Sequence, residues 1–299
     1  MVRSLFKQFL LLFSILVISI GITACQKFEG DQEIPAYIRI ERFQLTTDYS
    51  LEGSNTHNIS EVWVYVDDQL IGAFEMPATV PVLAKGNHKL ELRPGIKLNG
   101  IAATRAYYPF YKPYQIADFF FVEDSVQTIA PTTSYHNTIT FAWIEDFEYA
   151  SISLEKTGKS DTTVIKTSPI DSPEALLSDY SSYSGVVYLD EEASFFQIAS
   201  SEAFSLPGKG TPVFLELDYK CDQRMGIGLF AHIGPTIIDL PLVGVNPNTQ
   251  WNKIYINLSP IVTDYSDAEK FKIYFEADRS EETTARFYLD NIKLIHRNI

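Results

Sequence analysis

Residues 62–74 read Val-Trp-Val-Tyr-Val-Asp-Asp-Gln-Leu-Ile-Gly-Ala-Phe, two runs rich in β-branched and aromatic side chains with an Asp pair between them. Such runs favour strands, because branched and aromatic side chains fit a pleated surface. Asp tolerates the backbone conformations of a tight turn, so the pair predicts a β-hairpin. The stretch therefore predicts antiparallel β-structure.

Similar runs recur along the chain, and no window of twelve or more residues keeps a helical period. A stretch rich in Ser, Thr, Asp and Pro, residues 156–185, interrupts them. Many short strands separated by turn residues predict a sandwich or a barrel. We predict an all-β protein with two β-sandwich domains, residues 34–142 and 143–299, of which the second contains the polar loop 156–185. The strand-like runs are residues 36–43, 62–66, 70–74, 88–93, 119–122 and 138–143, then 186–189, 213–219, 227–231, 251–258, 271–276 and 285–294.

The N-terminus has the composition of an export signal. Arg3 and Lys7 precede an apolar run from Phe9 to Ile22, which is short for a membrane-spanning helix. Residues 22–25, Ile-Thr-Ala-Cys, resemble the lipobox of bacterial lipoproteins, in which a signal peptidase cuts before the cysteine and the thiol carries a diacylglycerol. The resemblance implies a cleaved signal peptide at residues 1–24 and a lipidated Cys25. The alternative is an ordinary secretory signal with a chance cysteine.

The residues after Cys25 indicate the membrane to which the lipoprotein is sorted. Gln26 resembles the class of lipoproteins sorted to the outer membrane, and acidic residues at 29, 31 and 33 resemble the surface-export signal of Bacteroidota-type lipoproteins. We therefore expect a protein anchored in the outer membrane through acyl chains and facing the cell exterior, with the periplasmic face as the alternative. Residues 25–33 are the lipidated cysteine and a short tether.

The charge of the chain excludes one class of partner. Without Arg3 and Lys7, 22 basic residues remain against 38 acidic ones, a net charge of −16. A nucleic-acid-binding protein needs a basic surface, so we expect no nucleic acid partner. Besides Cys25 the chain has only Cys221, in an alternating run, which we expect to be a buried side chain.

The first domain contains a local resemblance. Within residues 62–93, the hairpin is followed by Gly72, Pro77 and Gly86-Asn87-His88. This order resembles PEGA-type repeats, small extracytoplasmic β modules, except for extra residues between Gly72 and Pro77. It implies an Ig/PEGA-like sandwich with a scaffolding role.

An aromatic cluster follows at residues 107–114, with four Tyr and one Phe among two prolines. The prolines exclude a regular central strand. One interpretation is a loop that folds its rings back over the sheet. The other is an exposed contact surface for a protein or sugar, with Tyr107, Tyr108 and Tyr111 as the interface candidates.

The second domain resembles another family. Asp146-Phe147-Glu148, a strand with Trp251 and residues 287–292 resemble the carbohydrate-binding-module-like (galactose-binding-like) jelly rolls. In that family an Asp such as Asp290 helps to hold a structural calcium ion, and Glu148 is the matching partner. Calcium needs six to eight oxygens, and two donors can be named. The alternative is that Asp290 caps a turn.

Catalytic motifs are incomplete throughout. Gly158-Lys159-Ser160 lacks the first glycine of a P-loop, and Glu216-x-Asp218 lacks the second glutamate of a jelly-roll glycosidase. The five histidines have no metal-binding spacing. We therefore predict no enzyme activity and no cofactor besides the calcium considered above. Thr162 and Ser125 lie in short patterns that fit envelope O-glycosylation.

Two functions remain after these exclusions. The first is a non-catalytic, lipid-anchored accessory subunit of an outer-membrane complex for assembly, secretion or uptake, acting through contacts with other outer-membrane proteins. The alternative is a surface glycan-binding lipoprotein. The combination of a PEGA-like start with a jelly-roll end resembles Bacteroidota-type surface lipoproteins, and no aromatic sugar platform is evident in the sequence, so we favour the first.

Overall fold

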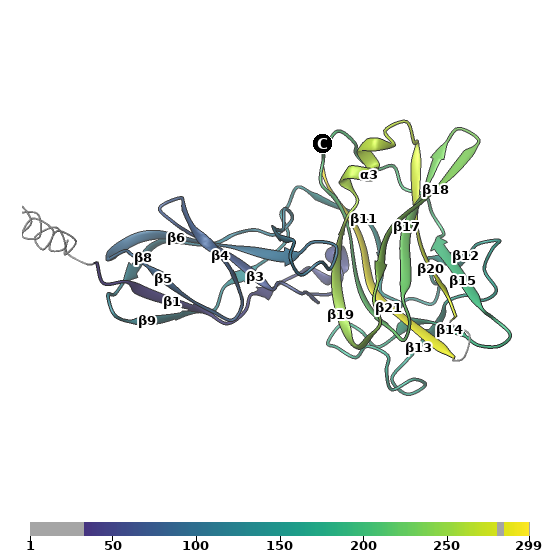
Figure 1. Cartoon of the computed structure of the whole chain (residues 1–299), viewed down its shortest axis with the longest axis horizontal. Helices are drawn as coiled ribbons and strands as arrows, with labels where there is room; N and C mark the ends of the chain where they lie inside the picture. The colour runs from purple at the N-terminus through teal and green to yellow at the C-terminus, as the bar shows by residue number, and fades with distance from the viewer. Residues whose placement is uncertain (1–32, 280–283, 299) are drawn as a thin grey trace, which may run out of the picture.

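The computed structural model describes residues 33–279 and 284–298. They form two β-rich bodies placed end to end, and the N-terminal body lies between the start of the described chain and the C-terminal body (Figure 1). Both bodies consist of packed, mostly antiparallel sheets. The predicted all-β, two-sandwich fold is confirmed.

The N-terminal domain packs two main sheets around one core. One sheet has the order β4-β3-β6-β7 with β8 also paired to β6, the other has the order β5-β1-β9, and β2 pairs with β10. Alternate side chains such as Val62, Val64, Leu90 and Leu92 are buried between the sheets. The strands are β1 (Ala36–Ile40), β2 (Gln44–Leu45), β3 (Glu61–Val66), β4 (Gln69–Glu75), β5 (Ala78–Val82), β6 (Gly86–Lys97), β7 (Arg105–Tyr107), β8 (Tyr114–Phe121), β9 (Val126–Ile129) and β10 (Thr132–Thr133).

The predicted hairpin is β3 and β4. Asp67 and Asp68 form its turn with φ of 49° and 64°, the left-handed values that a tight hairpin requires. The Asp67 carboxylate accepts hydrogen bonds from the backbone N–H of Lys89 at 3.0 Å and from the His88 ring at 2.7 Å. These bonds tie the turn to β6, and they explain why an Asp turn and a Gly-x-His sequence occur together in this segment.

The C-terminal domain is a sandwich of two larger sheets. The sheet called here the junction sheet has the order β13-β14-β21-β16-β19 with β11 on β21, and the outer sheet has the order β12-β15-β20-β17-β18. Leu215 and Leu217 of β16 face Leu229 and Ala231 of β17 in the shared core. The strands are β11 (Ile139–Glu145), β12 (Leu154–Lys156), β13 (Ile165–Thr167), β14 (Ser184–Leu189), β15 (Phe195–Ser200), β16 (Val213–Cys221), β17 (Met225–Ile233), β18 (Thr236–Val245), β19 (Asn248–Asn257), β20 (Lys270–Asp278) and β21 (Ala285–Arg297).

The boundary between the domains lies slightly before the predicted position. Strand β11 begins at Ile139 and pairs with β21, so residues 139–142 belong to the C-terminal domain. The polar stretch 156–185 lies well inside that domain. Its backbone is bonded to β15, from Thr157 N–H to Gln197 O and from Asp161 N–H to Phe195 O, each at 2.9 Å.

The described residues contain two short helices, α2 (Tyr49–Glu52) and α3 (Ser259–Asp264). Neither of these has the length and hydrophobicity that a helix crossing a bilayer needs. Cys221 is buried as expected, and burial raises the pKa of its thiol to about 11.

Candidate functional site

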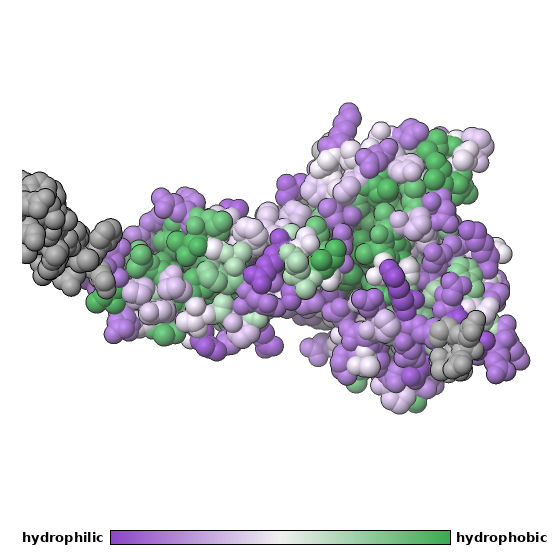
Figure 2. Space-filling view, in the orientation of Figure 1, coloured by the Kyte–Doolittle hydropathy of each residue, from purple (hydrophilic) through white to green (hydrophobic). Residues whose placement is uncertain are grey.

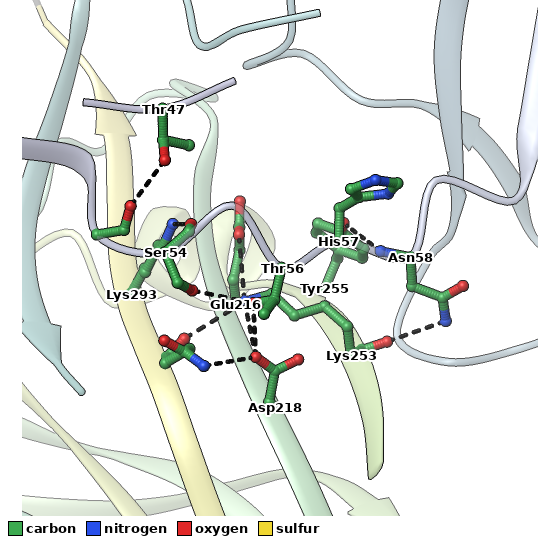
Figure 3. A network of polar contacts seen from close by, with 12 residues as sticks. Thr47, Ser54, Thr56, His57, Asn58, Glu216, Asp218, Lys253, Tyr255 and Lys293 are labelled. Atoms are coloured by element: carbon green, nitrogen blue, oxygen red, sulfur yellow. Dashed lines mark hydrogen bonds and ion pairs between the residues drawn. The ribbon is translucent and has the colours of Figure 1, made fainter. Parts of the chain in front are cut away.

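The contact between the two domains buries a cluster of charged side chains. Glu216, Asp218, Lys253 and Lys293 project from β16, β19 and β21 of the junction sheet, and the end of the N-terminal domain covers them (Figure 3). All four are buried. Two carboxylates and two amines balance in charge, which is how buried ionisable groups are tolerated.

Glu216 is held by tyrosines of the other domain. The hydroxyls of Tyr108 and Tyr135 donate to its carboxylate at 2.6 Å and 2.9 Å, and the Lys253 amine lies 3.8 Å away. Burial, followed by the charge of Glu216, raises the pKa of Tyr108 well above its ordinary value. These hydroxyls therefore act as fixed donors to an acid that water does not reach.

Asp218 connects the same two domains beside Glu216. Its Oδ2 accepts from Thr56 Oγ1 at 2.6 Å and from Asn291 Nδ2 at 3.0 Å, and the Lys253 amine lies 3.7 Å away. Lys293 donates to the carbonyl of Ser54 at 2.6 Å. Burial, and then the charge of Lys253, lower the pKa of Lys293 to about 7.

The aromatic cluster of the sequence lies in this contact. Tyr108 and Tyr111 are fully buried, and the Tyr108 ring packs edge-on against Phe214 and Tyr255 of the C-terminal domain. The prediction that Tyr108 and Tyr111 form a surface for an external partner is wrong, because the second domain of the same chain already covers them. Tyr107 is 37% exposed and stays a candidate for an external contact.

The proposed calcium ligands already make several hydrogen bonds. Glu148 Oε1 accepts from the backbone N–H groups of Ser182 and Tyr183, and Asp290 accepts from Asn291 N–H and the Ser184 hydroxyl. Burial, followed by the charge of Asp218, raises the pKa of Asp290 well above its ordinary value. Across residues 33–279 and 284–298, no three His, Cys, Asp or Glu side chains gather as metal ligands. The residues thus fit calcium poorly, and the ion stays a prediction.

The remaining predicted sites are scattered. Thr162 and Ser125 are half-buried, and the Thr162 carbonyl accepts from the Ser160 hydroxyl. O-glycosylation at either residue stays a prediction. Cys25 and the signal peptide lie outside the described residues.

The outer sheet leaves its outward face open. A hollow of about 470 Å³ lies over β15, β17 and β20, between the 155–159 segment and the start of β18. A second hollow, of about 280 Å³, continues toward Tyr274 and Glu276. We call this surface the outer-sheet groove; its lining includes Glu155, Thr157, Gln197, Phe230, His232, Ile237, Lys272, Tyr274 and Glu276.

One partly exposed ring, Phe230, lies in the outer-sheet groove, and the Tyr274 ring is buried beneath it. Phe230 stacks on Tyr274 with ring centroids 4.5 Å apart and planes inclined by 28°. The Tyr274 ring lies over Gly228, where an added Cβ would come within 2.3 Å of it. Gly228 therefore lets the ring lie flat, and Phe230 remains half-exposed above it.

Polar side chains surround these rings. Gln197 is held from both sides, because its amide donates to Glu276 at 2.8 Å and its oxygen accepts from Thr157 at 2.8 Å. The Lys272 amine donates to Glu155 at 2.6 Å. Gln197 is buried, so the polar groups that a ligand can reach include Glu155, Lys272 and Glu276. An apolar ring beside such polar groups is the usual composition of a site for a small polar ligand.

Sequence reasoning missed this groove. The sequence feature that could have indicated the groove is the spacing Gly226-x-Gly228-x-Phe230-x-His232, which places these four residues on one face of β17. The opposite face carries Ile227, Leu229 and Ala231 into the core.

Comparisons with known proteins find similarity of architecture. No protein-family model matches the chain, and no curated protein matches it. Solved structures that are similar include a carbohydrate-binding module of the β-sandwich superfamily (12% identity, 79% of this chain and 85% of that chain, TM-score 0.38) and the CBM22-1 xylan-binding domain of Paenibacillus barcinonensis Xyn10C (12% identity, 55% and 99%, TM-score 0.38). The enzymatically active domain of bacteriophage CBA120 tailspike protein 4 is similar over 47% of this chain and 18% of its own length (13% identity, TM-score 0.35). Values this low assign neither a family nor a ligand.

Proposed function

We propose that this protein is a non-catalytic, lipid-anchored glycan-binding protein whose ligand lies in the outer-sheet groove. The observation that carries the proposal is the half-exposed Phe230 ring, fixed over Tyr274 beside Gln197, Glu276 and Lys272. A sugar ring offers an apolar C–H face that suits an aromatic ring, and hydroxyls that need donors and acceptors around it.

The accessory-subunit hypothesis loses most of its predicted contact surface. Of the three tyrosines expected to form that surface, two are buried between the domains. An interface residue that anchors another protein has to be accessible before the partner arrives. The glycan-binding alternative therefore becomes the preferred function.

The carboxylates support binding rather than hydrolysis. Glu216 and Asp218 are buried under the N-terminal domain. In the groove, Glu155 is paired with Lys272 and Glu276 accepts from Gln197. Retaining and inverting glycosidases both need a proton donor and a second free carboxylate on opposite sides of the bond that is cut.

The groove also has a favourable orientation. The N-terminal domain covers the junction sheet, whereas the outer sheet lies on the opposite face of the sandwich. If Cys25 holds the protein on the outer membrane, the groove faces away from the tethered end. The binding site then points away from the membrane, which is toward the cell exterior for the surface-exposed protein expected from the sequence.

The test is a glycan array probed with the mature protein and two alanine variants. Phe230→Ala should lose binding, because the ring supplies the stacking surface. Tyr188→Ala is the matched control, since Tyr188 is an aromatic residue of the junction sheet with 41% exposure. Equal effects of the two variants, or no glycan bound by the wild type, would refute the proposal. Purification in mild detergent with a stoichiometric outer-membrane protein would instead restore the accessory-subunit hypothesis.

A further inference from the structure

The N-terminal domain exposes large apolar side chains at the end remote from the C-terminal domain. Five of them, each between 43% and 66% exposed, make up what we call the apolar tip. Figure 2 shows apolar surface on this domain that extends to the same end. The residues of the apolar tip are Ile34, Leu83, Phe120, Val122 and Val126.

Strand pairing brings these five residues together. Ala36 pairs with Val82, so Ile34 and Leu83 lie just beyond the same end of β1 and β5. Tyr37 pairs with Val126 on the other side of β1. Gly86 pairs with Phe121, which places Phe120 and Val122 at the beginning of β6. A hollow lined by Ile34, Leu83, Lys85, His88 and Glu123 lies between the two sheets at this end.

The basic groups at this end are paired with acidic ones, and Glu33 and Asp124 are exposed acidic residues beside them. Lys85 lies 2.5 Å from Glu123, Lys89 lies 2.6 Å from Asp68, and the His88 ring lies 2.7 Å from Asp67. Paired charges weaken the field that the tip presents to its surroundings. The tip therefore lacks the cluster of unpaired basic residues that would direct it to anionic lipid.

A short segment of the chain links the proposed anchor, Cys25, to the apolar tip. Eight residues, 26–33, separate Cys25 from Ile34, and they span at most ~28 Å when fully extended. A bilayer that holds the acyl chains of Cys25 is therefore the surface that stays within reach of the tip.

We propose that the apolar tip rests in the interfacial region of the lipid bilayer, so that the protein stands on the membrane by this end. The inference rests on the proposed lipid anchor and adds a second contact to it. Apolar side chains among paired charges fit the boundary between headgroups and acyl chains of neutral or zwitterionic lipid. Exposed apolar groups that cluster in this way commonly mark a membrane or protein contact.

The test places an environment-sensitive fluorophore on the tip. Phe120→Cys provides the labelling site, because Cys221 is buried and Cys25 is acylated in the mature protein. Ile165→Cys is the control, since Ile165 is 49% exposed, against 60% for Phe120, and lies on β13 of the C-terminal domain outside the outer-sheet groove. The mature proteins are reconstituted into phosphatidylcholine–phosphatidylethanolamine vesicles that carry a spin-labelled phosphatidylcholine quencher, after intact-mass analysis has established their acylation.

We expect a blue shift and quenching at position 120 and neither change at position 165. Adding Leu83→Glu and Val126→Glu to the Phe120→Cys protein should abolish both signals while the melting temperature stays unchanged. Equal signals at the two positions, or no quenching of an acylated protein, would overturn this inference and leave the anchor in place. A mass without acyl chains would overturn the anchor together with this inference. A photo-crosslink from position 120 to one protein in native membranes would overturn it in favour of a protein partner.

Discussion

Replacement of Tyr108 tests whether the domains are locked together by the buried network. Tyr108 is fully buried, and its hydroxyl donates to Glu216 at 2.6 Å. Tyr108→Phe keeps the ring and removes one hydrogen bond to a buried carboxylate, which costs about 1.5–3 kcal/mol. Tyr108→Ala also removes the ring from between Phe214 and Tyr255, and loss of a buried ring costs about 3–5 kcal/mol.

The matched control is its neighbour, Tyr107→Ala, which removes a partly exposed ring. Substitutions at exposed positions usually change stability by about 0.5 kcal/mol or less. Urea unfolding followed by tryptophan fluorescence measures both proteins, with Trp63 in the N-terminal domain and Trp143 and Trp251 in the C-terminal domain as reporters. We expect Tyr108→Ala to unfold at a clearly lower urea concentration than Tyr107→Ala. Equal midpoints for the two variants would mean that the junction contributes little to stability.

Three further predictions concern single side chains. Cys25→Ser should abolish incorporation of labelled palmitate and release the protein from the membrane; palmitate on the variant would contradict the anchor. The pKa of Lys293 is about 7 in the folded chain and 10.5 ordinarily. Between pH 7 and pH 10.5 the unfolded state therefore binds one more proton at Lys293 than the folded state does. Stability of the wild type should therefore rise from pH 7 to pH 10 relative to Lys293→Met, and parallel curves would argue against it. The raised pKa of Asp290 has the opposite effect on stability. Above pH 3.8 the folded state still holds the Asp290 proton, whereas the unfolded state has released it, so stability falls as the pH rises. Asp290→Asn should therefore flatten the fall in stability as the pH rises above 4. A rise in the melting temperature of the wild type on addition of calcium would contradict this and indicate a bound ion instead.

Local pattern was sufficient to predict the strands. The alternation at residues 62–74 and its Asp pair correspond to β3, β4 and their turn. Alternation shows which side chains share a face, and in β16 it separates Leu215 and Leu217 from Glu216 and Asp218. It does not show what covers the polar face.

The function of the tyrosine cluster could not be predicted for this reason. Glu216 reads as a solvent-facing residue of a strand, and Tyr108 reads as a residue of an exposed loop. They meet across 108 positions of sequence. The Tyr108 hydroxyl donates a hydrogen bond to the Glu216 carboxylate, and only the packing of the two domains brings the two residues together. The polar stretch 156–185 lies in the C-terminal domain, as predicted, but its composition does not predict its hydrogen bonds to β15.

The buried network also determines what the N-terminal domain can do mechanically. A flexible joint between domains needs an interface that can slide, whereas here sliding would separate Glu216 and Asp218 from Thr56 and the tyrosine hydroxyls of the N-terminal domain. A hydrogen bond to a charged group contributes about 1.5–3 kcal/mol, and sliding would break several of them at once, so the two domains should move as one body. In the proposed arrangement the N-terminal domain is therefore a rigid spacer. One end of this domain meets the bilayer, and the other covers the junction sheet. The outer-sheet groove is therefore held at a fixed distance from the membrane, where it can bind glycans that extend away from the lipid surface.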